Sequence, residues 1–273
     1  MTKTGYEKKR YVFPFAEGSA EKKSLLGGKG ANLAEMLKIG LPVPPGFTIS
    51  TEACLGYLKK GEPFLDEVWD EIQDAMIDLQ KESGKTFGGI KNPLLVSVRS
   101  GAAVSMPGMM DTILNLGLNA DSVKALIAVS GDERFALDSY RRFIQMFSNV
   151  VLGLEGEIFE NVLRQVKKDL GVSYDFEINP SAWKGVISRF LRIVEQETGE
   201  SFPDDPWVQL KKSVEAVFLS WKNPRAITYR RINKIPDDLG TAVNVMTMVF
   251  GNLGEDCGTG VCFTRNPSTG EKK

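Results

Sequence analysis

Helical patterns fill the middle of this chain, and strand-like patterns occur only on either side of them. Short apolar runs typical of strands occur at 94–98 and 242–250. Between them, apolar residues recur at helical spacing in four segments that turn residues separate: 135–152, 158–170, 183–197 and 207–221. The sequence therefore predicts strands on both sides of a helical middle.

The end of the sequence predicts a β-hairpin. The run 242–250 is followed by the glycine-rich loop 251–260 and by a second strand-like run at 261–264. A lone two-stranded hairpin is marginal in water, and 266–273 has the composition of a turn. We therefore expect the chain to stop within a domain, so that the fold is incomplete at its C-terminus.

The charge balance and the hydropathy pattern exclude several classes of partner. Lys and Arg number 34 and Asp and Glu 35, which leaves no basic field for nucleic acid or an anionic membrane. No apolar run approaches the roughly 20 residues that span a bilayer. The first residues contain Glu7 and lack the apolar core of a signal peptide, so we expect a cytoplasmic location. Three cysteines without a CxxC pair indicate reduced thiols.

The sequence contains no histidine. This absence removes Ser-His and Cys-His nucleophile pairs and HExxH metal sites. Carboxylates, lysines, arginines, hydroxyls and backbone amides remain. That set is better suited to binding a polyphosphate than to hydrolysing a bond.

A glycine-rich segment at 26–30 is the first candidate anion site. Gly28 and its neighbours leave backbone amides open to close approach, Lys29 supplies a cation, and a helical pattern begins there. A Walker A loop is excluded because Lys23 and Gly30 stand where it needs Gly and Ser or Thr. For a lone GGKG, an ordinary surface helix start with a solvated lysine is the favoured alternative.

The run 94–98 leads into Arg99, Ser100 and Gly101. This order predicts a buried strand that ends in a polar turn, with Arg99 at its mouth, where a guanidinium can hold two phosphate oxygens. A structural salt bridge is the alternative. The following stretch, 102–112, contains Met-Pro-Gly-Met-Met and predicts a loop of the kind that covers sites, or three methionines that fill gaps in a core.

Two further candidates lie near the end of the chain. The stretch 247–251 could offer backbone groups and Met248 to an adenine ring, although a plain core strand explains it as well. The loop 255–260, which contains Thr259, is glycine-rich enough to wrap phosphates. Its two acids would repel phosphates unless a divalent metal intervened, and an ordinary hairpin loop is the alternative.

Several long blocks, in order, resemble pyruvate, phosphate dikinase, and the resemblance covers essentially the whole chain. The blocks are LLGGKGANLAEM at 25–36, GLPVPPGFTIS at 40–50, LLVSVRSGAAVSMPGMMDTILNLG at 94–117, SYRRFIQMFSNVV at 139–151 and WKNPRAITYRRIN at 221–233. Their order is far more specific than any single motif.

The resemblance implies an α+β fold, namely an ATP-grasp nucleotide-binding domain with a helical inserted subdomain. Lys29 and Arg99 match the family's ATP-phosphate ligands, and we also expect the cofactor-binding residues to include Gly28, Gly101, Met248 and Thr259. The implied division is 1–118 plus about 205–240 for the first ATP-grasp subdomain, 119–204 for the insert and 241–273 for the start of the second subdomain. The acidic Mg²⁺ ligands are expected downstream of residue 273, and no catalytic residue within the chain.

In this family, ATP phosphorylates a histidine on a swivelling domain, which carries the group to pyruvate on a barrel domain. The products are phosphoenolpyruvate, AMP and diphosphate. The resemblance thus implies these two domains as partners within a longer protein and a homodimer, with no nucleic-acid or membrane partner, and we expect this chain alone to be inactive. Phosphoenolpyruvate synthase, glucan water dikinase and a stand-alone nucleotide-sensing module are alternatives.

Overall fold

A five-stranded antiparallel sheet forms the centre of the protein. The computed structural model describes residues 9–272. The strand order is β1-β2-β7-β5-β6, with β1 at Val12–Pro14, β2 at Gly46–Ile49, β5 at Val96–Ala102, β6 at Thr112–Leu116 and β7 at Thr241–Thr247. A separate parallel pair joins β3 (Thr86–Phe87) to β4 (Pro93–Leu94). The α+β prediction is confirmed.

One face of the sheet carries the main core. Alternate residues such as Phe47 on β2, Val98 on β5 and Val245 on β7 are fully buried. They share one hydrophobic cluster with residues of α2 (Thr51–Lys60), α3 (Glu62–Ser83) and α8 (Pro206–Ser220). The intervening residues of the strands point to the other face, as the period of two requires.

The second face of the sheet is only partly covered. Helix α1 (Lys23–Lys38) packs there, because Gly30 lies against Thr48 and Asn244 of the intervening set. Beyond α1 this face is open, and Arg99 in the middle of β5 is exposed between buried neighbours. The open part of this face is where the candidate site lies.

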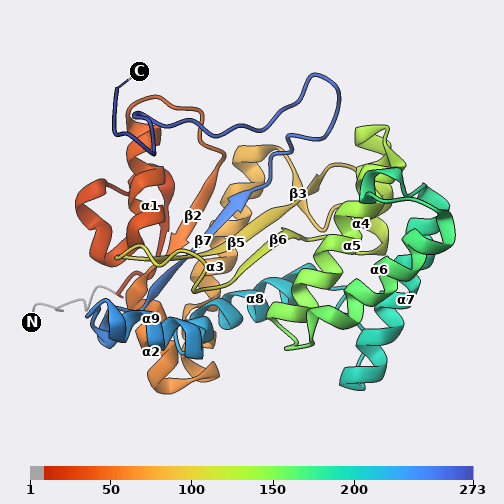
Figure 1. Ribbon diagram of the computed structural model, residues 1–273. Coiled ribbons are helices and arrows are strands. Elements are labelled where there is room, and N and C mark those ends of the chain that lie inside the picture. The colour runs from red at the N-terminus through yellow and green to blue at the C-terminus, as the bar shows by residue number, and fades with distance from the viewer. Residues whose placement is uncertain (1–8, 273) are drawn as a thin grey trace, which may run out of the picture.

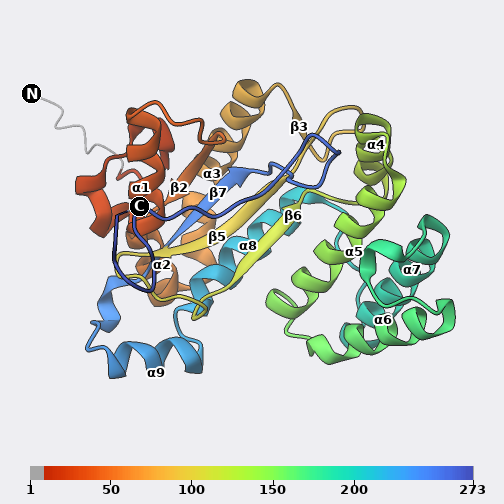
Figure 2. The ribbon, with the colours of Figure 1, turned by 45° about the horizontal axis from the view of Figure 1, so that its top comes forward.

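A second group of helices packs beside β6, at the end of the sheet away from α1 (Figures 1 and 2). Its members are α4 (Ala120–Ser130), α5 (Glu133–Val150), α6 (Gly156–Leu170) and α7 (Pro180–Thr198). Helices α5 to α8 confirm the four helical predictions. A short helix, α9 (Pro224–Ile232), follows α8, and 3₁₀ turns occupy Phe15–Glu17, Ala20–Lys22, Asp175–Glu177 and Asp237–Leu239.

The predicted C-terminal hairpin is wrong. Strand β7 is confirmed, but residues 261–264 form no strand, and Val261 and Phe263 are exposed. The physical reason is that β7 is an inner strand: β2 pairs with one of its edges and β5 with the other, so no free edge remains for a neighbour in sequence. The segment after β7 instead returns as coil toward α1 (Figures 1 and 2).

Within residues 9–272, no helix is long and apolar enough to cross a membrane.

Candidate functional site

The glycine-rich segment forms a kinked helix start pressed against β5. Gly27 breaks α1 with φ 67° and ψ 169°, and a Cβ at this position would lie 1.6 Å from the carbonyl oxygen of Gly101. At Gly30 a Cβ would lie 2.6 Å from Oγ1 of Thr48. These two glycines therefore allow the helix to approach the sheet closely. Gly28, by contrast, lines a hollow.

This hollow, of about 370 Å³, lies between the start of α1 and the loop that follows β5. Lys29 and Gly28 line it from the helix, and Gly101 lines it from the strand. The Nζ atom of Lys29 donates a hydrogen bond to the carbonyl oxygen of Ser100, at 2.8 Å. The structure thus brings together three of the residues that the sequence singled out.

The ammonium group of Lys29 lies in an unfavourable electrostatic setting. Its side chain still reaches solvent, yet burial by the surrounding protein lowers its pKa, and the nearby Arg99 guanidinium lowers it further. Two cations close together favour an anion between them. Lys29 is therefore suited to bind phosphate.

Arg99 does not lie where the sequence predicted. It was expected at the end of a strand, but β5 continues through Ser100, Gly101 and Ala102, which pair with β7. Pairing with Val243, Ala242 and Thr241 of β7 overrides the weak strand preference of these residues, so the ladder extends past the expected turn. The side chain of Arg99 lines a second hollow of about 230 Å³, which Lys29 also lines. Among residues 9–272 its guanidinium forms no ion pair, so the structural salt bridge is not observed.

Asn244 is a site residue that sequence reasoning missed. It is 2% exposed, accepts a hydrogen bond from Oγ1 of Thr48 at 2.9 Å, and lines the second hollow. A Cβ on Gly30 or on Gly101 would approach the Asn244 amide to within 2.8 Å and 2.6 Å. It therefore sets the spacing between the helix of Lys29 and the strand of Arg99. A polar residue in the apolar run 242–250 was the available signal.

The methionine-rich stretch is a loop, as predicted, and it lines the first hollow. Met106 is 6% exposed and packs with Trp221 and Ala226, and Met109 and Met110 are partly buried against the same cluster. Met106 and Met110 also line the hollow. These methionines therefore both fill a small core and face the site.

Neither Met248 nor Thr259 lines either hollow, although Met246, two residues before Met248, lines the second one. The backbone amide of Met248 donates to the carbonyl oxygen of Leu95 at 2.8 Å. Thr259 is exposed and rests against Gly251, where an added Cβ would lie 1.8 Å from Oγ1 of Thr259. The structure does not bring either residue to Lys29.

The part of the chain that the structure describes contains no cluster of three or more Asp, Glu, Cys or His side chains suited to hold a metal ion. Lys29 and Arg99 are cations, which suit phosphate oxygens and do not bind Mg²⁺. The residues of this site therefore fit the anionic part of a nucleotide.

Comparison with known proteins agrees with this geometry. The sequence profile described as "Pyruvate phosphate dikinase, AMP/ATP-binding domain" matches residues 23–62 and 60–273. The chain is 55% identical over 268 residues to pyruvate, phosphate dikinase of Rhizobium meliloti (strain 1021), a match that covers 97% of this chain and 30% of that protein.

Two other relatives give the same result. The Clostridium symbiosum pyruvate, phosphate dikinase is 53% identical over 264 residues, and the match covers 96% of this chain and 30% of the relative. The chloroplastic pyruvate, phosphate dikinase of Mesembryanthemum crystallinum is 55% identical over 266 residues, and the match covers 96% of this chain and 28% of that relative. The chain thus spans just under a third of the length of these relatives. It belongs to the pyruvate phosphate dikinase AMP/ATP-binding domain family and has an ATP-grasp-like α+β fold.

Proposed function

We propose that this chain is the ATP-binding portion of a pyruvate, phosphate dikinase, which converts ATP, pyruvate and phosphate to AMP, phosphoenolpyruvate and diphosphate. One observation carries the proposal. Lys29 and Arg99, which forms no ion pair with residues 9–272, share a hollow on the open face of the sheet. Lys29, Gly28 and Gly101 share the hollow beside it. Two neighbouring cations with glycine backbone between them suit a polyphosphate.

In this proposal Lys29 and Arg99 bind and neutralise phosphate oxygens but form no bond to phosphorus. A histidine on a separate swivelling domain attacks the β-phosphorus and AMP leaves, while these residues hold the phosphates in line. Phosphate then takes the γ-phosphoryl group and leaves as diphosphate, so that the β-phosphoryl group stays on the histidine. Such an acceptor fits a chain that contains no histidine of its own. The phosphoryl group then passes to pyruvate on a barrel domain of the same protein.

The remaining assignments belong to the same proposal. The first ATP-grasp subdomain comprises 1–118 plus about 205–240, the helical insert 119–204, and the second subdomain begins at 241. Met248 and Thr259 contact the nucleotide from this second part. Mg²⁺ accompanies ATP and takes its ligands from a downstream segment, and the whole protein is a cytoplasmic homodimer.

Titration calorimetry tests the nucleotide assignment. ATP is expected to bind this chain weakly but saturably, and adenosine is expected not to bind, because the residues brought together are those for phosphate. Lys29→Met should abolish the ATP signal. Lys38→Met is the matched control, since Lys38 lies in the last turn of the same helix. Equal binding of ATP to wild type and Lys29→Met would contradict the proposal.

ATP binding should also be coupled to proton uptake by Lys29. The pKa of Lys29 is lowered in the free chain, and bound phosphates raise it. Between these two pKa values binding takes up a proton, so affinity falls as pH rises through that window. At lower pH, where Lys29 is charged in both states, no uptake occurs.

Calorimetry in two buffers of different ionisation enthalpy measures this uptake. Above about pH 8 the phosphates of ATP are fully ionised and do not contribute. Lys29→Arg keeps the charge but cannot titrate, so it should bind ATP without proton uptake. If proton uptake persists in Lys29→Arg, the proton is taken up by another group.

A further inference from the structure

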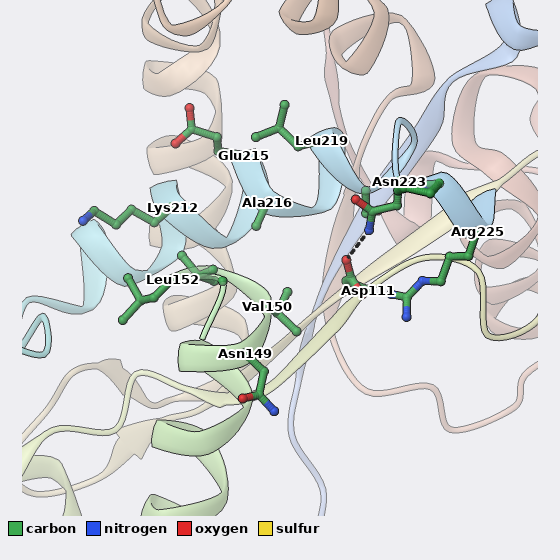
Figure 3. Close-up of a pocket in the computed structure, with 14 residues that line it drawn as sticks. Asp111, Asn149, Val150, Leu152, Lys212, Glu215, Ala216, Leu219, Asn223 and Arg225 are labelled. Carbon is green, nitrogen blue, oxygen red and sulfur yellow. Dashed lines mark hydrogen bonds and ion pairs between the residues drawn. The ribbon is translucent and has the colours of Figure 1, made fainter. Parts of the chain in front are cut away.

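We call the hollow of about 370 Å³ beside Lys29 the phosphate hollow. The loop 103–111, which lines it, is bonded to the connection between α8 and α9. The Asp111 carboxylate accepts hydrogen bonds from Nδ2 of Asn223, at 3.0 Å, and from Nη2 of Arg225 (Figure 3). Nε of Arg225 also donates to the carbonyl oxygen of Met109, at 3.1 Å. The Arg225 guanidinium thus bonds both to a side chain and to the backbone of the loop. We call Asp111, Asn223 and Arg225 the latch.

The segment that carries Asn223 and Arg225 is held by several contacts. Met106 packs from the loop onto Trp221 and Ala226. The Arg230 guanidinium lies 4.0 Å from the centroid of the Trp221 ring and donates to the Trp221 carbonyl oxygen at 2.6 Å, and Nε1 of Trp221 donates to the carbonyl oxygen of Asp237 at 2.9 Å. The segment that holds Asn223 and Arg225 is therefore fixed on both sides.

The loop itself has little internal support. The backbone amide of Met109 donates to the carbonyl oxygen of Met106 at 3.2 Å, and the backbone amide of Ser100 donates to the backbone carbonyl oxygen of Asp111 at 3.4 Å. Gly108 adopts φ +72° and has no atom within 4 Å of an added Cβ. A loop with so few backbone bonds depends on side-chain contacts for its order.

The latch also lies beside a larger hollow of about 900 Å³. The end of α5 and residues of α8 form its walls, and Asp111, Asn223 and Arg225 line it as well (Figure 3). The Arg225 side chain is 51% exposed and that of Asp111 only 17%. The latch is therefore reachable by solvent from this hollow, which shares no lining residue with the phosphate hollow, and its substitution need not disturb the core.

We propose that Asp111, Asn223 and Arg225 are positioning residues, which hold the loop 103–110 in the arrangement that lines the phosphate hollow. The inference rests on the proposed nucleotide function and extends it to residues that do not touch the nucleotide. An exposed ion pair by itself stabilises little. Here the ion pair between Arg225 and Asp111 is combined with the Asn223 hydrogen bond and with the bond from Arg225 to the Met109 carbonyl. Loss of the Arg225 side chain therefore frees a loop, and ligand binding must then order that loop again.

Hydrogen exchange of residues 100–113 in this chain, followed by mass spectrometry, tests whether the latch holds the loop. Arg225→Ala should speed exchange in this segment while the thermal unfolding midpoint stays unchanged. Arg225→Lys keeps the charge opposite Asp111 but has one point of contact in place of a fork, so it should restore part of the protection. Arg231→Ala is the matched control, because Arg231 is exposed on the same helix and forms no ion pair within the described residues.

ATP titration of the same variants tests the link to binding. Arg225→Ala should weaken ATP binding about threefold to tenfold, the range expected when a loop must be ordered on binding, and Arg231→Ala should leave it unchanged. Unchanged exchange in Arg225→Ala overturns the inference, and so does faster exchange with unaltered ATP affinity. Absence of ATP binding in the wild type would overturn the proposed function instead, while the exchange rates still decide whether the latch holds the loop.

Discussion

Arg99→Ala is expected to lower the ATP-dependent half-reaction of the full-length protein about 100-fold or more, while exchange between pyruvate and phosphoenolpyruvate continues at the wild-type rate. Loss of one well-placed donor to a developing charge costs about 10²–10³ in rate. Arg99 has no ion-pair partner within the described residues, so its removal leaves no buried carboxylate unpaired. Phosphorylation of the acceptor histidine by labelled ATP measures the first half-reaction, and isotope exchange measures the second.

Two variants make this test specific. Arg99→Lys keeps the positive charge but loses the fork, and it should fall between wild type and alanine. Lys23→Ala removes a cation that lines the phosphate hollow but not the second hollow, which Arg99 lines. This variant should lower the ATP-dependent half-reaction less than Arg99→Ala does. Equal loss of both half-reactions in Arg99→Ala would show that the residue supports the whole protein rather than the ATP site.

Gly27→Ala is expected to destabilise the protein by about 3 kcal/mol or more. The backbone conformation of Gly27, φ 67° with ψ 169°, is essentially restricted to glycine and costs an L-residue about 1–3 kcal/mol. The new Cβ would also collide with the Gly101 carbonyl at 1.6 Å, which forces α1 away from β5. Overpacking of this kind adds about 1–3 kcal/mol. Urea unfolding followed by circular dichroism measures the free energy of unfolding.

Gly40→Ala separates the two contributions. Gly40 also has a positive φ, +82°, but no atom lies within 4 Å of an added Cβ. It should therefore show only the backbone cost, about 1–2 kcal/mol. If Gly27→Ala and Gly40→Ala lose equal stability, the close approach of helix and strand contributes nothing and our account of Gly27 is wrong.

The sequence predicted the local features of this fold well and the non-local features poorly. Helices α5 to α8 were predicted because each buries one stripe, and a stripe is visible in a single segment. The position of β7 between β2 and β5 was not predictable, because strand order depends on pairing between residues far apart in the chain. The hairpin prediction was wrong for this reason.

The candidate site shows the same limit. Lys29 and Arg99 were selected as candidate phosphate ligands from local motifs, and both line the open face of the sheet. The reasons given for the glycines were incomplete: Gly27 and Gly30 permit close packing, and only Gly28 of these three lines the phosphate hollow. Asn244 and Arg225 were missed as site residues, since their contacts with β5 and with the Met109 loop exist only in the folded chain.

The inner position of β7 has a consequence for the order in which this protein can assemble during synthesis. Strand β2 and strand β5 emerge from the ribosome early, but β7, which joins them, begins 145 residues after β5 begins, at Thr241 against Val96. Until then each of these two strands lacks a partner on the edge that β7 will occupy, and such unpaired edges promote association with other chains. We therefore expect nascent chains shorter than about 250 residues to depend on chaperones, and the spacing of Lys29 and Arg99 to be set only after β7 has inserted.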